Sequence, residues 1–336
     1  MTVLAWVVGS GGLLGSHVRG AVELHSGFHA WDPGALPWGD PPALRDRLER
    51  HTRDFVRTAA EQGHGAWSVF WCAGTGVVGT PAEDLEREVL VWERFLAGLA
   101  QALAGRSSTR PPPGRVFLAS SAGGVYGQGE GGAVTEDSPC RPISDYGRSK
   151  LRQERALVEW ARQQPQVSTL TARVSNLYGP GQKMGKSQGL ISHMSQCLIH
   201  HRPVHIYVPL DTIRDYLFVE DAAGAIVRWV ERLGWEAREG GEARQILKIC
   251  AAEQETTIAA LIGLFRRIAR RHMKVVTGLH PSQGQQPARL WLRSTRWTDE
   301  PRTARTGLLE GIARVHRHHL ALYQAGDLAA PPPRES

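Results

Sequence analysis

Short, nearly continuous apolar runs alternate with longer amphipathic segments through the first half of the chain. A parallel sheet is covered by helices on both faces, so its strands are apolar on both sides and joined by crossover helices. The apolar runs predict strands at 3–8, 68–73, 115–120 and 168–174. The segments between them predict helices over 13–22, 43–62, 82–104 and 146–163. The pattern therefore predicts an α/β fold with a doubly wound parallel sheet.

The second half of the chain is less regular. Its pattern predicts a long loop and a helix within 179–202, helices over 221–232 and 257–272, and a late strand over 245–250. We expect a sheet domain over residues 1–178, to which 204–232 and 244–251 return, and a smaller, interleaved lobe over 179–328. The last eight residues, 329–336, include three prolines and predict a disordered tail.

Composition is that of an ordinary globular protein, with 41% hydrophobic and 22% charged residues. No basic segment precedes the first apolar run, and no run reaches the roughly 18–20 residues that cross a bilayer. The cysteines lie far apart and form no C-x-x-C pair: Cys72, Cys140, Cys197 and Cys250. This spacing favours free thiols in a reducing cytosol over disulfides or a zinc site. We expect a cytoplasmic protein that holds no metal and binds no membrane.

The formal net charge of +7 raises the question of nucleic acid. Basic residues are scattered, and the densest group, within 266–271, lies on a predicted amphipathic helix. A solvated helix face is therefore favoured over a nucleic-acid surface. Surplus arginine also suits a small polyanionic substrate such as a nucleotide diphosphate. The histidines at 316, 318 and 319 favour a polar helix face over a metal site.

A glycine-rich turn follows the first predicted strand and opens the first predicted helix. Gly9, Gly12 and Gly15 have the spacing G-x-x-G-x-x-G, with Leu13 and Leu14 beginning the helix. Glycines allow the tight turn and the close approach of backbone N–H groups to a pyrophosphate, which the helix dipole also attracts. The turn predicts a dinucleotide site, against the alternative of a purely structural turn.

Asp32 follows 28–31, where a second strand is expected to end. A carboxylate there accepts hydrogen bonds from an adenosine ribose and repels a 2′-phosphate. No arginine follows directly. The position therefore favours NAD over NADP, and the alternative is a loop aspartate before Pro33.

Tyr146 and Lys150 lie four residues apart, on one face of a predicted helix. A phenol with an ordinary pKa near 10 is a poor acid or base at neutral pH, and a neighbouring cation stabilises its phenolate. The 40 basic side chains comprise five lysines and 35 arginines, so a lysine here indicates a need for a compact charge. Alone, the spacing is also that of a chance pair on a helix surface.

Three further motifs accompany this pair in a fixed order. They are the strand and turn 116–127, the segment 173–182 and the segment 214–221. Together with the glycine turn and the Tyr–Lys pair, they resemble the extended short-chain dehydrogenase/reductase family of NAD-dependent nucleotide-sugar epimerases and dehydratases. The resemblance implies a Rossmann domain that binds NAD, a substrate lobe that binds a nucleotide sugar, and a homodimer formed by a four-helix bundle.

The same resemblance implies roles for individual residues. Tyr146 would exchange a proton with a sugar hydroxyl, while Lys150 would hold the nicotinamide ribose and tune Tyr146. Further positions would line the cofactor, namely Ala73, Gly74 and Ser120, and others would contact the substrate, namely Ser121, Asn176 and Arg214.

The chain departs from the family at the third catalytic group. The hydroxyl of the 4-epimerases lies four residues before the tyrosine of the V-Y-G motif, and here that position is Ala122. We expect Ser121 to serve instead, with Ser120 as the second choice. The Asp–Glu pair of the dehydratases is replaced by Gly123 and Gly124, which disfavours 4,6-dehydration.

What remains is redox chemistry at one carbinol, most simply at C4: epimerisation, or reduction of a keto-sugar. Two alternatives stay open. One is an NADP-dependent reductase of a non-sugar carbonyl compound. The other is a non-catalytic dinucleotide-binding regulator.

Overall fold

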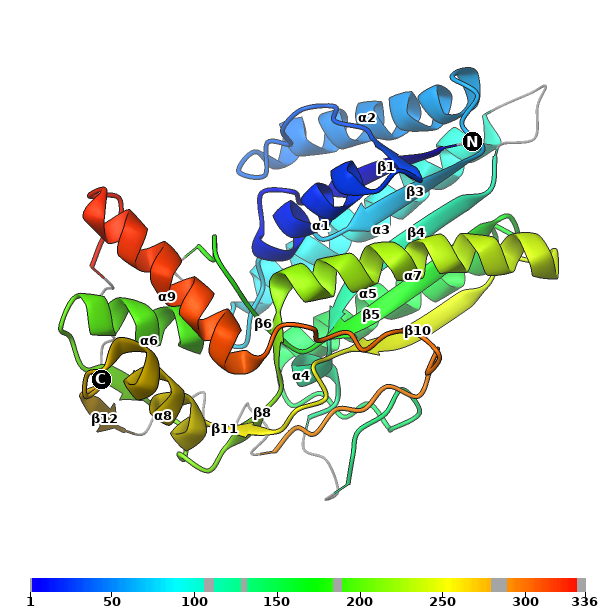
Figure 1. Cartoon of the computed structure of the whole chain (residues 1–336). Helices are drawn as coiled ribbons and strands as arrows, with labels where there is room; N and C mark the ends of the chain where they lie inside the picture. Colours follow the sequence, from blue (N-terminus) through cyan, green and yellow to red (C-terminus); the bar gives the residue numbers. More distant parts are fainter. Residues whose placement is uncertain (1, 106–111, 128–131, 184–188, 279–288, 331–336) are drawn as a thin grey trace.

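The computed structural model describes residues 2–105, 112–127, 132–183, 189–278 and 289–330. One sheet lies between two layers of helices, and a smaller lobe sits at one end of it (Figure 1). The strands of the sheet are β1 (Val3–Val8), β2 (Phe28–Ala30), β3 (Ala66–Trp71), β4 (Gly114–Ser121), β5 (Val167–Val174) and β10 (Gln245–Cys250). They are all parallel, in the order β10-β5-β4-β3-β1-β2. The predicted doubly wound parallel fold is confirmed.

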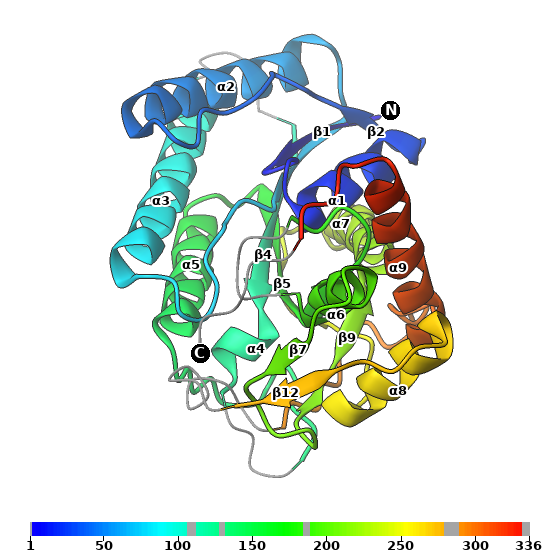
Figure 2. The ribbon, with the colours of Figure 1, turned by 90° about the vertical axis from the view of Figure 1, so that its left-hand side faces the viewer.

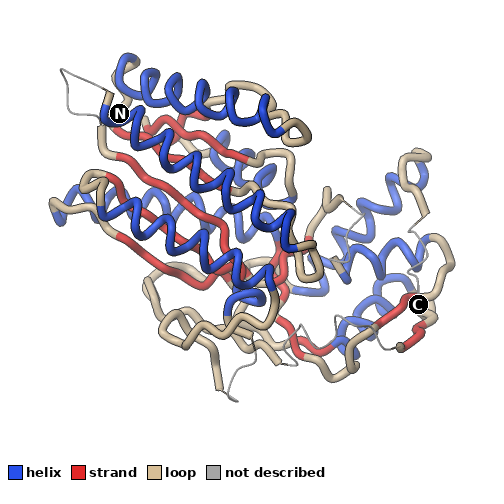
Figure 3. The backbone as a smooth tube through the Cα atoms, turned by 180° about the vertical axis from the view of Figure 1, so that it is seen from behind, coloured by secondary structure: helices blue, strands red, loops and turns tan. Residues whose placement is uncertain are grey.

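Helices cover both faces of the sheet (Figures 2 and 3). One face carries α2 (Pro41–Glu61), α3 (Ala82–Ala104) and α5 (Asp145–Arg162), and the other carries α1 (Leu13–Leu24) and α7 (Val219–Gly240). The inner strands β1, β3, β4 and β5 are buried along nearly their whole length, as expected for a sheet with both faces covered, and the edge strands β2 and β10 are partly exposed. All the strand carboxyl ends therefore meet at one edge, where ligands bind in such folds.

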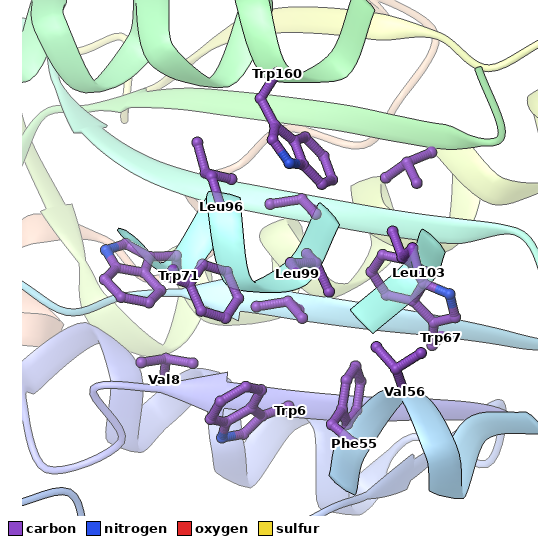
Figure 4. Packing of buried hydrophobic residues seen from close by; sticks show 14 of the residues in the cluster. Trp6, Val8, Phe55, Val56, Trp67, Trp71, Leu96, Leu99, Leu103 and Trp160 are labelled. Carbon is purple, nitrogen blue, oxygen red and sulfur yellow. The ribbon is translucent and has the colours of Figure 1, made fainter. Parts of the chain in front are cut away.

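Aromatic side chains fill the layer between the sheet and the helices α2, α3 and α5 (Figure 4). The rings of Trp71 and Trp92 lie 4.8 Å apart between centroids, and Trp67 and Phe55 lie 6.1 Å apart. Large apolar rings bury much surface and gain further from tilted and edge contacts. Several of the chain's tryptophans thus serve the core of the sheet domain.

The second lobe is built mainly from helices. It contains α6 (Leu190–Ile199), α8 (Ile258–Ala269), α9 (Leu308–Gln324), and the parallel pair β7 (Val204–Ile206) and β12 (Val275–Thr277). Apolar side chains from these elements form a separate cluster. The range 204–206 differs from the expected division, because it pairs with 275–277 in this lobe rather than joining the main sheet.

Two short two-stranded sheets connect the lobe to the main sheet. They are β6 (Asn176–Tyr178) with β9 (Tyr216–Phe218), and β8 (Ile213–Arg214) with β11 (Thr256–Thr257). The one-turn helix α4 (Ala122–Val125) follows β4. These elements lie between the two parts, which is where the motif residues gather.

A late segment returns from the second lobe to the sheet domain. The carboxylate of Glu136 accepts hydrogen bonds from the backbone of Ile249 at 2.8 Å and of Thr295 at 2.8 Å, and from Ser294 Oγ at 2.6 Å. Although burial opposes its charge, these donors lower the pKa of Glu136. The buried carboxylate therefore fastens the segment to the end of β10.

None of the helices within the described ranges combines the length and apolar content that a bilayer crossing requires. Within the same ranges, no three metal-ligating side chains converge. The predicted disorder of the tail falls, for 331–336, outside the described residues.

His319 gives the second lobe a pH-dependent stability. Its side chain is 2% exposed and is one of the buried side chains of α9. Burial, and then the neighbouring His318 and His316, lowers its pKa to about 4. The folded chain therefore resists a proton that the unfolded chain takes up below about pH 6.5. Stability should fall as the pH drops from about 6.5 towards 4.

We expect this histidine to contribute about 2 kcal/mol to the loss of unfolding free energy between pH 7 and pH 5. Urea denaturation of a His319→Gln variant at both pH values measures it, since the variant lacks the titrating group. The matched control, His272→Gln, changes an exposed histidine and should keep the wild-type pH dependence. If the free energy of unfolding fell equally between the two pH values in the wild type and in His319→Gln, the expectation would be contradicted.

Candidate active site

The glycine turn occupies a space that admits no side chain at two of its positions. Gly9 has φ +88°, and a Cβ there would lie 2.6 Å from the backbone nitrogen of Ala73. A Cβ on Gly15 would lie 2.2 Å from the carbonyl oxygen of Gly9. Gly12 is the N-cap residue of α1 and has no side chain that could accept the first-turn N–H groups of Leu13 and Leu14. Such a turn at a helix N-terminus suits an anion.

A cavity of about 910 Å³ opens from this turn. Its walls include the glycine turn, the residues that follow β3, and side chains of α2 and α3. Trp38, Leu44 and Phe95 supply an apolar side, and Ala73 and Gly74, which follow β3, also line it. The size and the mixed lining fit a dinucleotide such as NAD. The residues present therefore fit the predicted cofactor.

Asp32 lies just past β2, where the sequence predicts it. One oxygen of its carboxylate lies 3.0 Å from Arg19 Nη2, and the other accepts the N–H of Gly34 at 2.9 Å. Its side chain is 54% exposed and lies outside the described lining of the cavity. The sequence analysis considered only the residues directly after Asp32. It therefore missed Arg19, which comes from α1.

Tyr146 and Lys150 lie side by side on α5. The ammonium of Lys150 is 6.0 Å from the centre of the Tyr146 ring. It donates hydrogen bonds to Gln153 Oε1 at 3.1 Å and to the carbonyl of Ala119 at 3.4 Å. An ammonium has three hydrogens, so one remains for a ligand. A Cβ built on Gly74 would lie 3.5 Å from this ammonium, so Lys150 lies next to a residue of the cavity wall, although neither it nor Tyr146 belongs to the described lining.

Two glycines let α4 and α5 touch and so position Tyr146. A Cβ on Gly147 would lie 1.9 Å from the carbonyl oxygen of Gly124, and one on Gly124 would lie 3.0 Å from the Tyr146 ring. Ser144 caps α5 by accepting the N–H of Gly147 at 3.2 Å. Gly124, which we read only as the loss of a dehydratase carboxylate, also has this packing role.

The two serines that end β4 have different partners. Ser120 is buried and donates to Glu154 Oε1 at 2.5 Å, and Glu154 forms two hydrogen bonds with Arg173 at 3.0 and 2.7 Å. Ser121 is half-buried, and its Oγ caps α4 by accepting the N–H of Gly124 at 3.2 Å. Ser120 is therefore engaged inside the domain, whereas Ser121 caps the turn whose Gly124 lies against the ring of Tyr146.

The methyl group of Ala122 packs among apolar side chains. It is fully buried in an apolar cluster with Tyr126, Val134, Leu290 and Leu292. The position at which the resembling 4-epimerases carry a hydroxyl is thus part of the hydrophobic packing between α4 and the late segment.

Asn176 and Arg214 come together through the residue between β8 and β9. Asn176 Nδ2 donates to the carbonyl of Asp215 at 2.9 Å, and its side chain is exposed. Arg214 is 8% exposed, and burial lowers its pKa. Asp215 accepts the N–H groups of Ala252 at 2.9 Å and Gln254 at 3.0 Å, which fixes the site's backbone.

Glu88 on α3 is a site residue that sequence reasoning missed. One of its oxygens accepts the N–H of Thr75 at 2.5 Å, the N–H of Gly76 at 2.8 Å and the hydroxyl of Thr75 at 3.1 Å. It shapes the loop after β3, directly beside Gly74. Its partners lie 12 and 13 residues away, so no local pattern announces it.

Residues 5–238 match the model of the "NAD dependent epimerase/dehydratase family". The chain belongs to this family. The identification confirms the family resemblance found in the motifs.

Two curated relatives and one solved structure show the range of similarity. The dTDP-4-dehydro-6-deoxyglucose reductase of Escherichia coli is 30% identical over 36% of this chain and 38% of that protein. A UDP-glucose 4-epimerase of Mycolicibacterium smegmatis is 31% identical over 34% of this chain and 36% of that protein. These matches span little more than a third of the relatives' length.

The structure of MoeE5 in complex with UDP-glucose and NAD superposes with a TM-score of 0.75 at 24% identity. The superposition covers 96% of this chain and 100% of that one. At this identity the likeness concerns the fold, which extends through both parts of the molecule.

Proposed function

We propose that this chain catalyses hydride-transfer chemistry at one carbinol of a nucleotide sugar, either epimerisation at C4 or reduction of a keto-sugar. The observation that carries the proposal is the position of the Tyr146–Lys150 pair, beside Gly74 in the wall of a dinucleotide-sized cavity. Without that cavity, the residue types and the spacing of Tyr146 and Lys150 would not distinguish this chemistry from a chance pair on a helix surface.

The residues have distinct parts in this chemistry. A bound nicotinamide would supply the hydride acceptor and donor. The Tyr146 phenolate would take the proton from the sugar hydroxyl, and the phenol so formed would give it back. The remaining hydrogen of the Lys150 ammonium is available to a ribose hydroxyl, and its charge stabilises the phenolate. Asn176 and Arg214 hold the substrate's diphosphate, with Arg214 as the buried cation.

We propose NAD as the cofactor. Asp32 at the end of β2 favours a free 2′-hydroxyl. Arg19 offsets part of its charge, since the two groups lie 3.0 Å apart. The preference for NAD therefore rests on the geometry of the carboxylate as a hydrogen-bond acceptor more than on charge repulsion.

Native mass spectrometry combined with turnover assays tests the proposal. The purified protein should carry a nicotinamide dinucleotide and convert a UDP- or dTDP-hexose. An epimerase should work without added cofactor, because the nicotinamide is reduced and reoxidised within one turnover. A ketoreductase should consume one NADH for each product. A protein that neither binds the dinucleotide nor turns over would refute the proposal, and one that binds without turnover would favour the regulator.

A homodimer is also proposed, through the outer faces of α3 and α5. Val158 on α5 is 36% exposed, and Leu90 on α3, which also lines the cavity, is 37% exposed. Arg152 bridges the helices by binding Glu86 at 2.7 Å and Glu93 at 2.9 Å. Sedimentation as a monomer at micromolar concentration would contradict this assembly.

We predict that Ser121→Ala lowers kcat by about ten-fold, because its hydroxyl serves in place of the group missing at Ala122. Steady-state kinetics on the substrate identified above measures the effect. Ser138 offers a matched control, since its Oγ also accepts a backbone N–H three residues away, from Thr135 at 2.9 Å. Ser138→Ala should leave kcat unchanged, and an equally active Ser121→Ala would remove Ser121 from the mechanism.

A further inference from the structure

The described lining of the dinucleotide cavity contains a single residue from the second lobe. All its other lining residues lie between positions 9 and 98 of the sheet domain, and the exception is Lys183. Lys183 is one of only five lysines in the chain. Lys183 extends from the second lobe to the wall of this cavity, so we ask which ligand group its ammonium could bind there.

The loop that carries Lys183 is held by the second lobe. The N–H of Gly181 donates to Nε2 of His318 on α9 at 3.3 Å. Gln182 Oε1 accepts the hydroxyl hydrogen of Ser192 on α6 at 2.7 Å. Both residues before Lys183 are therefore fixed by separate helices of that lobe, and the lysine's position follows the position of the lobe.

The other charges around the cavity are largely engaged. Arg87 pairs with Asp84, Arg45 pairs with Asp46 at 3.0 Å, and one oxygen of Glu88 accepts the hydrogen bonds of the loop after β3. Within the described part of the chain, Lys183 and Arg94 are the lining cations that form no hydrogen bond or ion pair. A dinucleotide brings two phosphate charges into this space, and a free ammonium binds phosphate well.

We propose that Lys183 binds the pyrophosphate of the bound dinucleotide and so closes the cofactor site from the substrate lobe. The inference rests on the proposed function, since it requires the cavity to hold the cofactor. Backbone N–H groups of the glycine turn contact the pyrophosphate from one side, and Lys183 contacts it from the other. The affinity for the cofactor therefore depends on the position of the second lobe, which carries Lys183.

Calorimetric titration of the full chain tests this assignment without any activity assay. The probes are ADP-ribose, which has the pyrophosphate, adenosine, which lacks it, and UDP, which represents the substrate's diphosphate. Nucleotide already bound to the purified protein is quantified first. Loss of one charge-assisted hydrogen bond should weaken ADP-ribose binding by about ten-fold or more in Lys183→Ala. Lys183→Arg should restore most of the affinity, and adenosine should bind equally to all variants.

Lys274→Ala is the matched control, because it removes another exposed lysine of the second lobe, one that lies outside the described lining of the cavity. It should leave ADP-ribose binding within about two-fold, as expected of an exposed charge away from the ligand. Unchanged ADP-ribose binding in Lys183→Ala would overturn the assignment, as would an equal loss for adenosine or a loss confined to UDP. A wild-type chain that binds neither NAD nor ADP-ribose would instead refute the proposed function itself.

Discussion

Replacement of Tyr146 by phenylalanine is expected to lower kcat by about 10³-fold while the cofactor stays bound. The change removes only the hydroxyl that exchanges a proton with the sugar. The ring that packs against Gly124 and the ammonium of Lys150 keep their places. Turnover assays and native mass spectrometry on the same preparation measure activity and cofactor content together.

Tyr323→Phe is the matched control for this change. Its side chain is 48% exposed on α9, far along the chain from the site, and its hydroxyl has no part in the proposed chemistry. The control should retain wild-type kcat. A Tyr146→Phe variant that keeps more than about a tenth of the activity would contradict general acid–base catalysis by this residue.

Replacement of Glu154 by alanine is expected to reduce the free energy of unfolding by about 3–5 kcal/mol. Glu154 is 8% exposed and Arg173 is 4% exposed, so the pair lies within the domain. Burial opposes the charge of Arg173, yet the hydrogen bonds and charge of Glu154 raise the pKa of this guanidinium above its ordinary value. Without its partner, the guanidinium would stay charged, buried and unpaired.

Urea denaturation of the variant and the wild type at neutral pH measures this loss. The Ser120 hydroxyl would lose its acceptor as well, and Glu154 lies one helical turn beyond Lys150. Activity should therefore fall together with stability. Glu159→Ala removes an exposed carboxylate from the same helix and should change stability by less than about 0.5 kcal/mol. A loss below about 1 kcal/mol for Glu154→Ala would mean that the pair contributes little.

The sheet domain was predictable because its signals are local. The strand over 3–8, the helix over 82–104 and the late strand over 245–250 match the structure at both ends. Apolar runs, turn glycines and amphipathic periods all lie within windows of a few residues there. The helix expected to end at 232 continues to 240 and passes through Gly234, a residue type that disfavours a helix interior.

The second lobe was less predictable because its pairings are short and distant. The strands β7 and β12 have three residues each and lie about 70 positions apart, which leaves no periodicity to detect. The helix α9 was expected only as a polar helix face around the histidines, without bounds. Half-buried polar side chains such as His316 blur its apolar stripe.

The candidate site divides in the same way. Tyr146, Lys150 and the glycine turn follow from spacing within single motifs. Arg19, Glu88 and Lys183 have their neighbours on other elements, and only the packing of helices against the sheet brings them in. The sequence around each of these charged residues therefore does not reveal its neighbours in the fold.

The burial of Ala122 constrains how this enzyme can change. Its methyl group packs against Leu290 and Leu292, which come from the late segment fastened by Glu136. A serine introduced there would place a hydroxyl in apolar surroundings, at a cost of about 1–3 kcal/mol. A serine at this position would therefore require a compensating change in the C-terminal packing, so the residue type beside the proposed site is set by a segment distant in sequence.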